Sequence, residues 1–142
     1  FILQRQADLP VSVIAKRVGL SQTPCWNRIK KLEEEGVIER KITILNKSKV
    51  NLNITIFLMI TVRNHNDEWI KKFLAILKKY NNILEAHRVT GTQADYIIKI
   101  VAENIEEYDK FQQLLIKEIK FNSMSSGISL KELKSSNILP IR

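Results

Sequence analysis

Hydrophobic residues in the first third of the chain recur with the period of an α-helix. Pro10 favours the start of one helix and Gly19 its end. A second helix is expected to begin after the N-cap residue Ser21 and to end at Gly36. The predicted buried faces are Val11, Ile14, Ala15 and Val18 in the first helix, and Cys25, Ile29 and Leu32 in the second. The pattern therefore predicts two short helices joined by a tight turn.

The segments around this helical pair have other patterns. Residues 1–6 are expected to be the end of a helix, and residues 37–45, rich in β-branched side chains, to be extended. Residues 46–53 are polar and are interpreted as a linker. The expected domains are therefore residues 1–45 and residues 54–142.

From residue 54 onwards, alternating segments and amphipathic segments follow one another. Two helices are expected to begin near the capping residues Asp67 and Asn104. The apolar residues assigned to them are Ile70, Phe73, Leu74 and Leu77, and then Ile105, Tyr108, Leu115 and Ile119. Strands are expected at residues 54–62, 83–90, 96–102 and 125–133. The order strand–helix–strand–strand–helix–strand predicts a ferredoxin-like βαββαβ domain, so the fold class is α+β.

The first of these strands is apolar on both faces, which predicts that both faces are covered. In a ferredoxin-like domain the two helices cover one face of the sheet, and the other face needs a partner. A second copy of the chain is the simplest partner. We therefore expect a homodimer as the minimal unit.

The formal net charge of +8 favours a polyanionic partner. Cys25 is the only cysteine, so no internal disulfide can form and a reducing cytoplasm is expected. The longest apolar run is too short to cross a membrane, and the sequence indicates no signal peptide. His65 and His87 lie in unrelated segments, so no metal site is expected. No triad, Cys–His pair or carboxylate pair is evident, which argues against an enzyme and against a cofactor.

The helical pair has the geometry that places a second helix in the major groove of duplex DNA. Base contacts are expected from the side chains near the start of that helix, and phosphate contacts from the cations that follow. The predicted DNA-binding residues are Ser21, Gln22, Thr23, Trp26, Asn27, Arg28, Lys30 and Lys31. Two alternatives remain open: the helices serve only for packing, or Trp26 packs on the neighbouring helix instead of on DNA.

The run from Ile14 to Arg40, IAKRVGLSQTPCWNRIKKLEEEGVIER, resembles the signature of the Lrp/AsnC family of bacterial and archaeal feast/famine regulators. The similarity continues through ITILNKSKVNL at the linker and HRVTGTQADY, which ends at Tyr96. It therefore covers essentially the whole chain.

The resemblance implies a winged helix-turn-helix joined to a regulator-of-amino-acid-metabolism (RAM) domain. The implied function is that of a sequence-specific transcriptional regulator that responds to an amino acid or a related small molecule. Dimers are expected to assemble further, into tetramers or octamers. Two other readings of the same architecture stay open: a RAM-type ligand sensor without DNA binding, and an enzyme similar to sirohaem decarboxylases.

The resemblance also implies that the effector binds near the loop of Thr90, Gly91, Thr92, Gln93 and Asp95. Backbone amides of a tight turn can hold a carboxylate, and an aspartate can hold an ammonium group. The alternative is an ordinary hairpin in which Gly91 supplies a positive φ.

Three features depart from the family pattern. One extra residue separates Gly91 from Asp95, which puts the effector pocket in question. Asn51 stands where the family usually has glycine, and asparagine tolerates a left-handed conformation better than most residues. The resemblance also implies about a dozen further residues before the position of Leu3, so the first helix is expected to be incomplete in this sequence.

Overall fold

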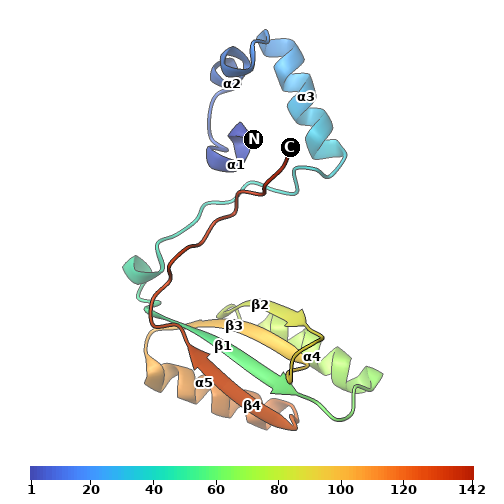
Figure 1. Cartoon of the computed structure of the whole chain (residues 1–142), viewed down its shortest axis with the longest axis vertical. Coiled ribbons are helices and arrows are strands. Elements are labelled where there is room, and N and C mark those ends of the chain that lie inside the picture. The colour runs from blue at the N-terminus through green and yellow to red at the C-terminus, as the bar shows by residue number, and fades with distance from the viewer. The chain divides into compact units, whose positions relative to one another are not determined.

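The computed structural model describes residues 1–142 as two compact units (Figure 1). One unit comprises Phe1–Ile44 together with Leu133–Arg142, and the other comprises Leu45–Glu132. The sequence-based division assigned all of residues 54–142 to the second domain. The structure differs from it in grouping the C-terminal segment with the N-terminal helices.

The first unit consists of three helices, α1 (Ile2–Arg5), α2 (Val11–Val18) and α3 (Gln22–Glu34). Pro10 precedes α2, and Gly19 ends it in the left-handed conformation with φ 71°. The Leu20 amide then donates to the Ala15 carbonyl at 2.9 Å, which closes the turn between α2 and α3. The expected pair of short helices is confirmed, with bounds within two residues of the predicted ones.

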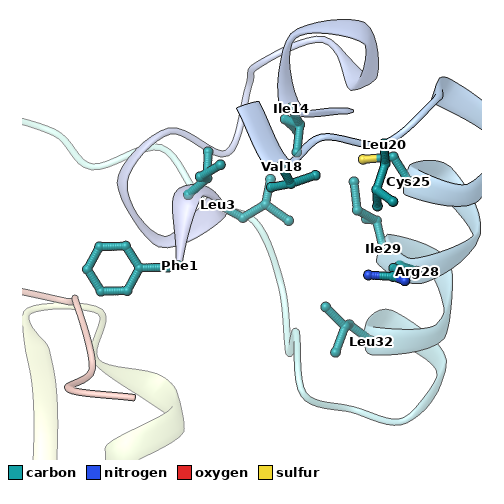
Figure 2. Close-up of a pocket in the computed structure, with 10 residues that line it drawn as sticks. Phe1, Leu3, Ile14, Val18, Leu20, Cys25, Arg28, Ile29 and Leu32 are labelled. Atoms are coloured by element: carbon teal, nitrogen blue, oxygen red, sulfur yellow. The ribbon is translucent and has the colours of Figure 1, made fainter. Parts of the chain in front are cut away.

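The core of this unit is small. Ile14, Ala15 and Cys25 are its buried residues. Val18 and Leu32, which were expected to be buried, are 47% and 37% exposed. Both line an apolar groove with Leu3 and Ile29 (Figure 2), and α1 is a single turn that covers only part of that groove.

The segment between the units is extended through residues 37–45, as expected, but no strand of the structure pairs with it. A 3₁₀ helix, η1 (Lys47–Val50), then occupies the predicted linker. Asn46 caps it by accepting from the amides of Ser48 and Lys49, and Asn51 ends it at φ 62°. Asparagine therefore does adopt the left-handed conformation at the position where glycine is usual in the family.

The second unit has the predicted βαββαβ order. Its elements are β1 (Ile54–Thr61), α4 (Asp67–Lys79), β2 (Ile83–Arg88), β3 (Tyr96–Ala102), α5 (Ile105–Glu118) and β4 (Ser123–Ile128). The strands form one antiparallel sheet in the order β2-β3-β1-β4 (Figure 1). The ferredoxin-like arrangement is thereby confirmed.

The core of the second unit lies between one face of the sheet and both helices. Ile56, Leu58 and Ile60 of β1 are 0% exposed, and they belong to one cluster with residues of α4 and α5. The alternate residues of β1 lie on the opposite face, where Phe57 is 41% exposed. The expectation that both faces of this strand are covered is wrong for the single chain, because both helices pack on the same side.

Some details of the second unit also differ from the predictions. Asn66, one residue earlier than the expected Asp67, caps α4 by accepting from the Trp69 amide at 2.8 Å. Asn104 caps α5 as predicted, accepting from the Glu107 amide at 2.8 Å. Leu74 and Ile105 were assigned to the core but are 56% and 60% exposed, because each lies on the outer side of its helix.

The last strand is shorter than expected. β4 ends at Ile128, which pairs with Ile56, and the Ser129 amide makes one further hydrogen bond to the Thr55 carbonyl. Since β1 begins at Ile54, residues beyond 130 have no strand to pair with. The apolar residues that suggested a longer strand are instead exposed; Leu130 is 99% exposed.

Candidate nucleic-acid interface and ligand loop

Helix α3 has a buried side and an exposed side. Cys25 faces α2 and is 3% exposed, and Ile29 packs beside it. On the opposite side, six of the predicted DNA-binding residues form one exposed polar face, which we call the α3 face. They are Gln22, Thr23, Trp26, Asn27, Lys30 and Lys31. The helical period therefore brings most of the predicted residues onto a single surface.

Two of the predicted residues lie apart from this face. Ser21 occupies the N-cap position of α3, but its side chain makes no capping hydrogen bond. Arg28 borders the apolar groove of Figure 2, together with Val18 and Leu32. The structure thus places Arg28 at the edge of the α3 face instead of at its centre.

Trp26 is exposed rather than packed on the neighbouring helix. Its side chain is 51% exposed, and the Lys30 ammonium lies over the ring, 5.5 Å from the ring centroid. A cation over an aromatic ring is a weak interaction at an exposed site. The indole ring is therefore available to a partner that approaches the α3 face.

The cations of α3 are held only by weak ion pairs. Lys30 lies 4.0 Å from Glu33, and Lys31 lies 3.8 Å from Glu35. Glu33 also lies 3.7 Å from Lys41. Exposed pairs of this kind contribute about 0–1 kcal/mol, so a phosphate can replace the carboxylate as the partner of each lysine. The glutamates follow closely after the lysines at the end of α3, and the first two turns of the helix carry no carboxylate.

The predicted ligand loop joins β2 to β3 and is held by hydrogen bonds at its base. The Val89 amide donates to the Asp95 carbonyl, and the Asp95 amide donates to the Ile60 carbonyl, each at 2.9 Å. Gly91 has φ 82°, which a side chain would strain. The hydroxyl of Thr92 bonds both the amide and the carbonyl of Ala94 at 3.1 Å, so the longer loop is internally ordered.

Within this loop, Asp95 has a structural contact that sequence reasoning missed. Its Oδ2 accepts the Val62 amide at 2.8 Å, which fixes the loop to the end of β1. Gly91, Thr92 and Gln93 are exposed, as is Thr90 at the start of the loop. The loop therefore offers polar groups and backbone amides to solvent, while one carboxylate oxygen of Asp95 is already engaged.

A hollow beside this loop was also missed. Val62, the residue bonded to Asp95, lines it together with Arg63, Asn66, Trp69, Lys120 and Asn122, among others. These residues come from the segments after β1 and after α5, which are far apart in the sequence. No local motif could have indicated it, because it forms only when the sheet brings the two segments together.

Models of two protein families match this chain. The model of the Lrp/AsnC ligand-binding domain matches residues 55–139, and a winged helix-turn-helix DNA-binding model matches residues 1–39. The chain belongs to the Lrp/AsnC family.

Individual relatives agree with this assignment. The glutamate uptake regulatory protein of Zymomonas mobilis is 35% identical over 140 residues, which are 99% of this chain and 85% of the relative. The regulator Zrp of the same organism is 38% identical over 139 residues, covering 98% of this chain and 90% of the relative. Both are named as regulators, so this Lrp/AsnC protein is a DNA-binding transcriptional regulator with a ligand-binding domain, and the enzyme alternative is set aside.

Solved structures of Lrp/AsnC regulators have the same fold. The AsnC family regulator of Agrobacterium tumefaciens is 38% identical, with a TM-score of 0.93 over 98% of this chain and 90% of that one. A transcriptional regulator of Neisseria meningitidis, solved as a complex with L-Met, is 26% identical, with a TM-score of 0.92 over the same shares.

Two other properties of this Lrp/AsnC protein can be read from the structure. His, Cys, Asp and Glu side chains do not gather in groups of three that could hold a metal ion. None of its helices combines the length and apolar character needed to cross a membrane.

Proposed function

We propose that the α3 face, with Arg28 at its edge and Ser21 at the helix start, contacts DNA in the major groove. Gln22, Thr23, Trp26 and Asn27 approach base edges, and Arg28, Lys30 and Lys31 contact phosphates. The observation that carries the proposal is the division of α3. Its apolar side contains the buried Cys25, while its polar side is exposed and carries amides, an indole and cations.

The experiment is fluorescence anisotropy of the full chain with a labelled duplex from the promoter region of its own gene. Gln22→Glu places a negative charge on the α3 face, and we expect about tenfold or greater loss of affinity because DNA, which is negatively charged, repels that carboxylate. Gln113→Glu, an exposed position on α5, is the matched control and should bind as the parent does. Equal binding by both variants would contradict the assignment of the α3 face.

The protein is proposed to act as a homodimer that pairs through the open face of its sheet. This face has an apolar centre formed by Phe57, Met59 and Ile97. Lys99 of β3 lies beside Phe57 and pairs with Glu85 of the outer strand β2 at 3.3 Å, and Ser125 lies on the other outer strand. An apolar centre with a polar rim is typical of a protein interface. Dimers are further proposed to assemble into tetramers or octamers, as the family resemblance implies.

Light scattering tests the dimer directly. Phe57→Glu should convert the dimer to a monomer, because it replaces a large apolar side chain of the interface with a charge that loses its hydration there. Leu74→Glu is the matched control, since Leu74 is 56% exposed but lies on α4, away from the open sheet face. A parent chain that is monomeric at micromolar concentration would refute the dimer.

The ligand is proposed to be an amino acid or a related small molecule that binds near residues 90–95. Support comes from the exposed polar groups of the loop and from the L-Met held by the Neisseria regulator.

The proposed division of roles follows the predicted domains. Residues 1–45 bind DNA, residues 46–53 link the domains, and residues 54–142 bind the ligand and form the oligomer. The free thiol of Cys25 and a DNA partner fit a cytoplasmic protein.

A thermal-shift screen with the twenty amino acids tests the ligand class, since a ligand that binds the folded state raises Tm. Gly91→Ala should abolish the shift, because φ 82° strains any side chain and changes the loop. Gly36→Ala introduces the same kind of strain, at φ 75°, in the other unit and should keep the shift. No shift with any amino acid would exclude this ligand class.

A further inference from the structure

The C-terminal segment makes a specific contact within the first unit. After β4 and the Ser129 amide, the chain leaves the sheet and runs without regular secondary structure. Residues 133–142 then group with the N-terminal helices. The segment therefore begins at a strand of the ligand-binding domain and ends in the unit that carries the DNA-binding helices.

Gln4 of α1 binds this segment with both ends of its side-chain amide. The Leu139 amide donates to Gln4 Oε1 at 2.6 Å, and Gln4 Nε2 donates to the Leu139 carbonyl at 3.4 Å. A carboxamide carries a donor and an acceptor side by side, so it can bond both backbone groups of one residue, as a neighbouring strand would. The two residues are 135 positions apart in the sequence.

Hydrogen bonding, more than burial, holds the segment in place. Leu139 is 64% exposed and Ile141 is 56% exposed, so little apolar surface is removed from water. Each of the two Gln4–Leu139 hydrogen bonds shifts an equilibrium by roughly two- to tenfold, and the one at 3.4 Å is long, so together they do not make the contact permanent. The segment is therefore able to dock and to detach.

We propose that Gln4 is a docking site for the C-terminal segment, and that the docked segment is a second tether on the DNA-binding unit. The first tether is the covalent linker of residues 46–53. Two tethers allow the DNA-binding unit fewer orientations than one, because the second closes a loop of chain. The docked C-terminal segment thereby connects β4 of the ligand-binding domain to α1, in addition to the connection that the linker makes.

The consequence for DNA binding rests on the proposed dimer. In a dimer, one α3 helix binds the first half-site and the α3 helix of the other protomer then binds the second. When each DNA-binding unit has fewer orientations, the effective concentration of that second helix at the second half-site is higher. Docking should therefore favour binding to paired half-sites. A single half-site, which only one α3 helix occupies, should be bound with the same affinity whether or not the segment is docked.

The first experiment measures docking alone, as hydrogen exchange of the Leu139 amide in the full chain. Gln4→Ala should remove its protection, whereas Gln4→Glu keeps the acceptor and should retain part of it. Gln6→Ala is the matched control, because Gln6 lies beside α1 and contacts Arg17 instead of the segment. Equal protection of Leu139 in the parent chain and in Gln4→Ala would overturn the docking site.

The second experiment measures affinity for duplexes that carry one or two copies of the half-site footprinted with the parent protein. Gln4→Ala should weaken binding to the paired site about fivefold and leave the single site unchanged. Leu139→Pro removes the donating amide from the other side of the contact and should have the same effect, with no further loss in the double variant. Equal weakening at both duplexes would show a folding defect in α1 and overturn the tether.

The two proposals can fail separately. A parent chain that is monomeric by light scattering would refute the dimer and with it the effect on paired sites. Hydrogen exchange of the Leu139 amide in that monomeric chain would still show whether Gln4 binds the C-terminal segment.

Discussion

Helices α3 and α4 have the same length, 13 residues, but they use it differently. Helix α4 buries Trp69, Phe73 and Ile76 against the sheet. Helix α3 buries Cys25 alone. A helix that binds its own domain needs a wide apolar face, whereas one that binds a partner needs only enough apolar surface to hold it in position. The small apolar face and the large polar face of α3 therefore fit a helix that binds a partner through its exposed side.

The two tryptophans of the chain show the same contrast. Trp69 is 9% exposed, stacks on Phe73 at a centroid distance of 4.9 Å, and donates its indole N–H to the Lys120 carbonyl at 2.9 Å. Trp26 is 51% exposed and lies near one lysine. The ring of Trp69 packs on other side chains and its N–H is hydrogen-bonded within the unit, whereas about half of the Trp26 side chain is exposed to solvent.

The largest expected effect is on stability, and it separates these two residues. Trp69→Ala should lower the free energy of unfolding by about 3–5 kcal/mol, because it opens a cavity in the core. Trp26→Ala should change it by less than about 0.5 kcal/mol, since the side chain is exposed. Urea denaturation followed by circular dichroism measures both, and a large loss in Trp26→Ala would mean that Trp26 supports the fold.

A second prediction concerns base preference on the α3 face. Asn27→Ala should relax the preference at one base pair by about 1–3 kcal/mol, because the amide can pair with a base edge. Competition binding with every single-base change of the site is the measurement. Asn64→Ala, at an exposed asparagine outside α3, serves as the control. Uniform weakening across all sequences would reassign Asn27 to the phosphate backbone.

The helix caps of α4 and α3 give a smaller difference in stability, in the same direction as the tryptophans. Asn66→Ala should destabilise the protein by about 1 kcal/mol, since Asn66 Oδ1 accepts the Trp69 amide at 2.8 Å. Ser21→Ala should cost only a few tenths of a kcal/mol, because the Ser21 side chain makes no capping bond. Thermal unfolding of both variants compares them, and equal losses would show that Ser21 caps α3 in solution.

Much of the fold was predictable because it depends on local pattern. The helical period predicted α2 and α3, and the order of alternating and amphipathic segments predicted the sheet of the second unit. The α3 face was predictable for the same reason, since a helix places residues 22, 23, 26, 27, 30 and 31 on one side.

The features that could not be predicted depend on contacts between distant residues. The end of β4 is set by where β1 begins, and no local property of residues 129–133 shows it. Asp95 was interpreted as a ligand for an ammonium group, but its carboxylate accepts the amide of Val62, 33 residues away. The choice of Asn66 over Asp67 as the cap was missed for a different reason: both residue types are good caps, so the residue types alone do not show where the chain enters α4.

The central claim is that the exposed cations of α3 contact phosphates, and the salt dependence of DNA binding tests it most directly. Lys30→Ala alone should reduce the slope of log affinity against log salt by about one unit, and Lys30→Ala with Lys31→Ala by about two. Lys71→Ala with Lys72→Ala, an adjacent pair of exposed lysines on α4, should leave the slope unchanged. A slope that stays the same without Lys30 and Lys31, or that falls equally for the α4 pair, would contradict the claim.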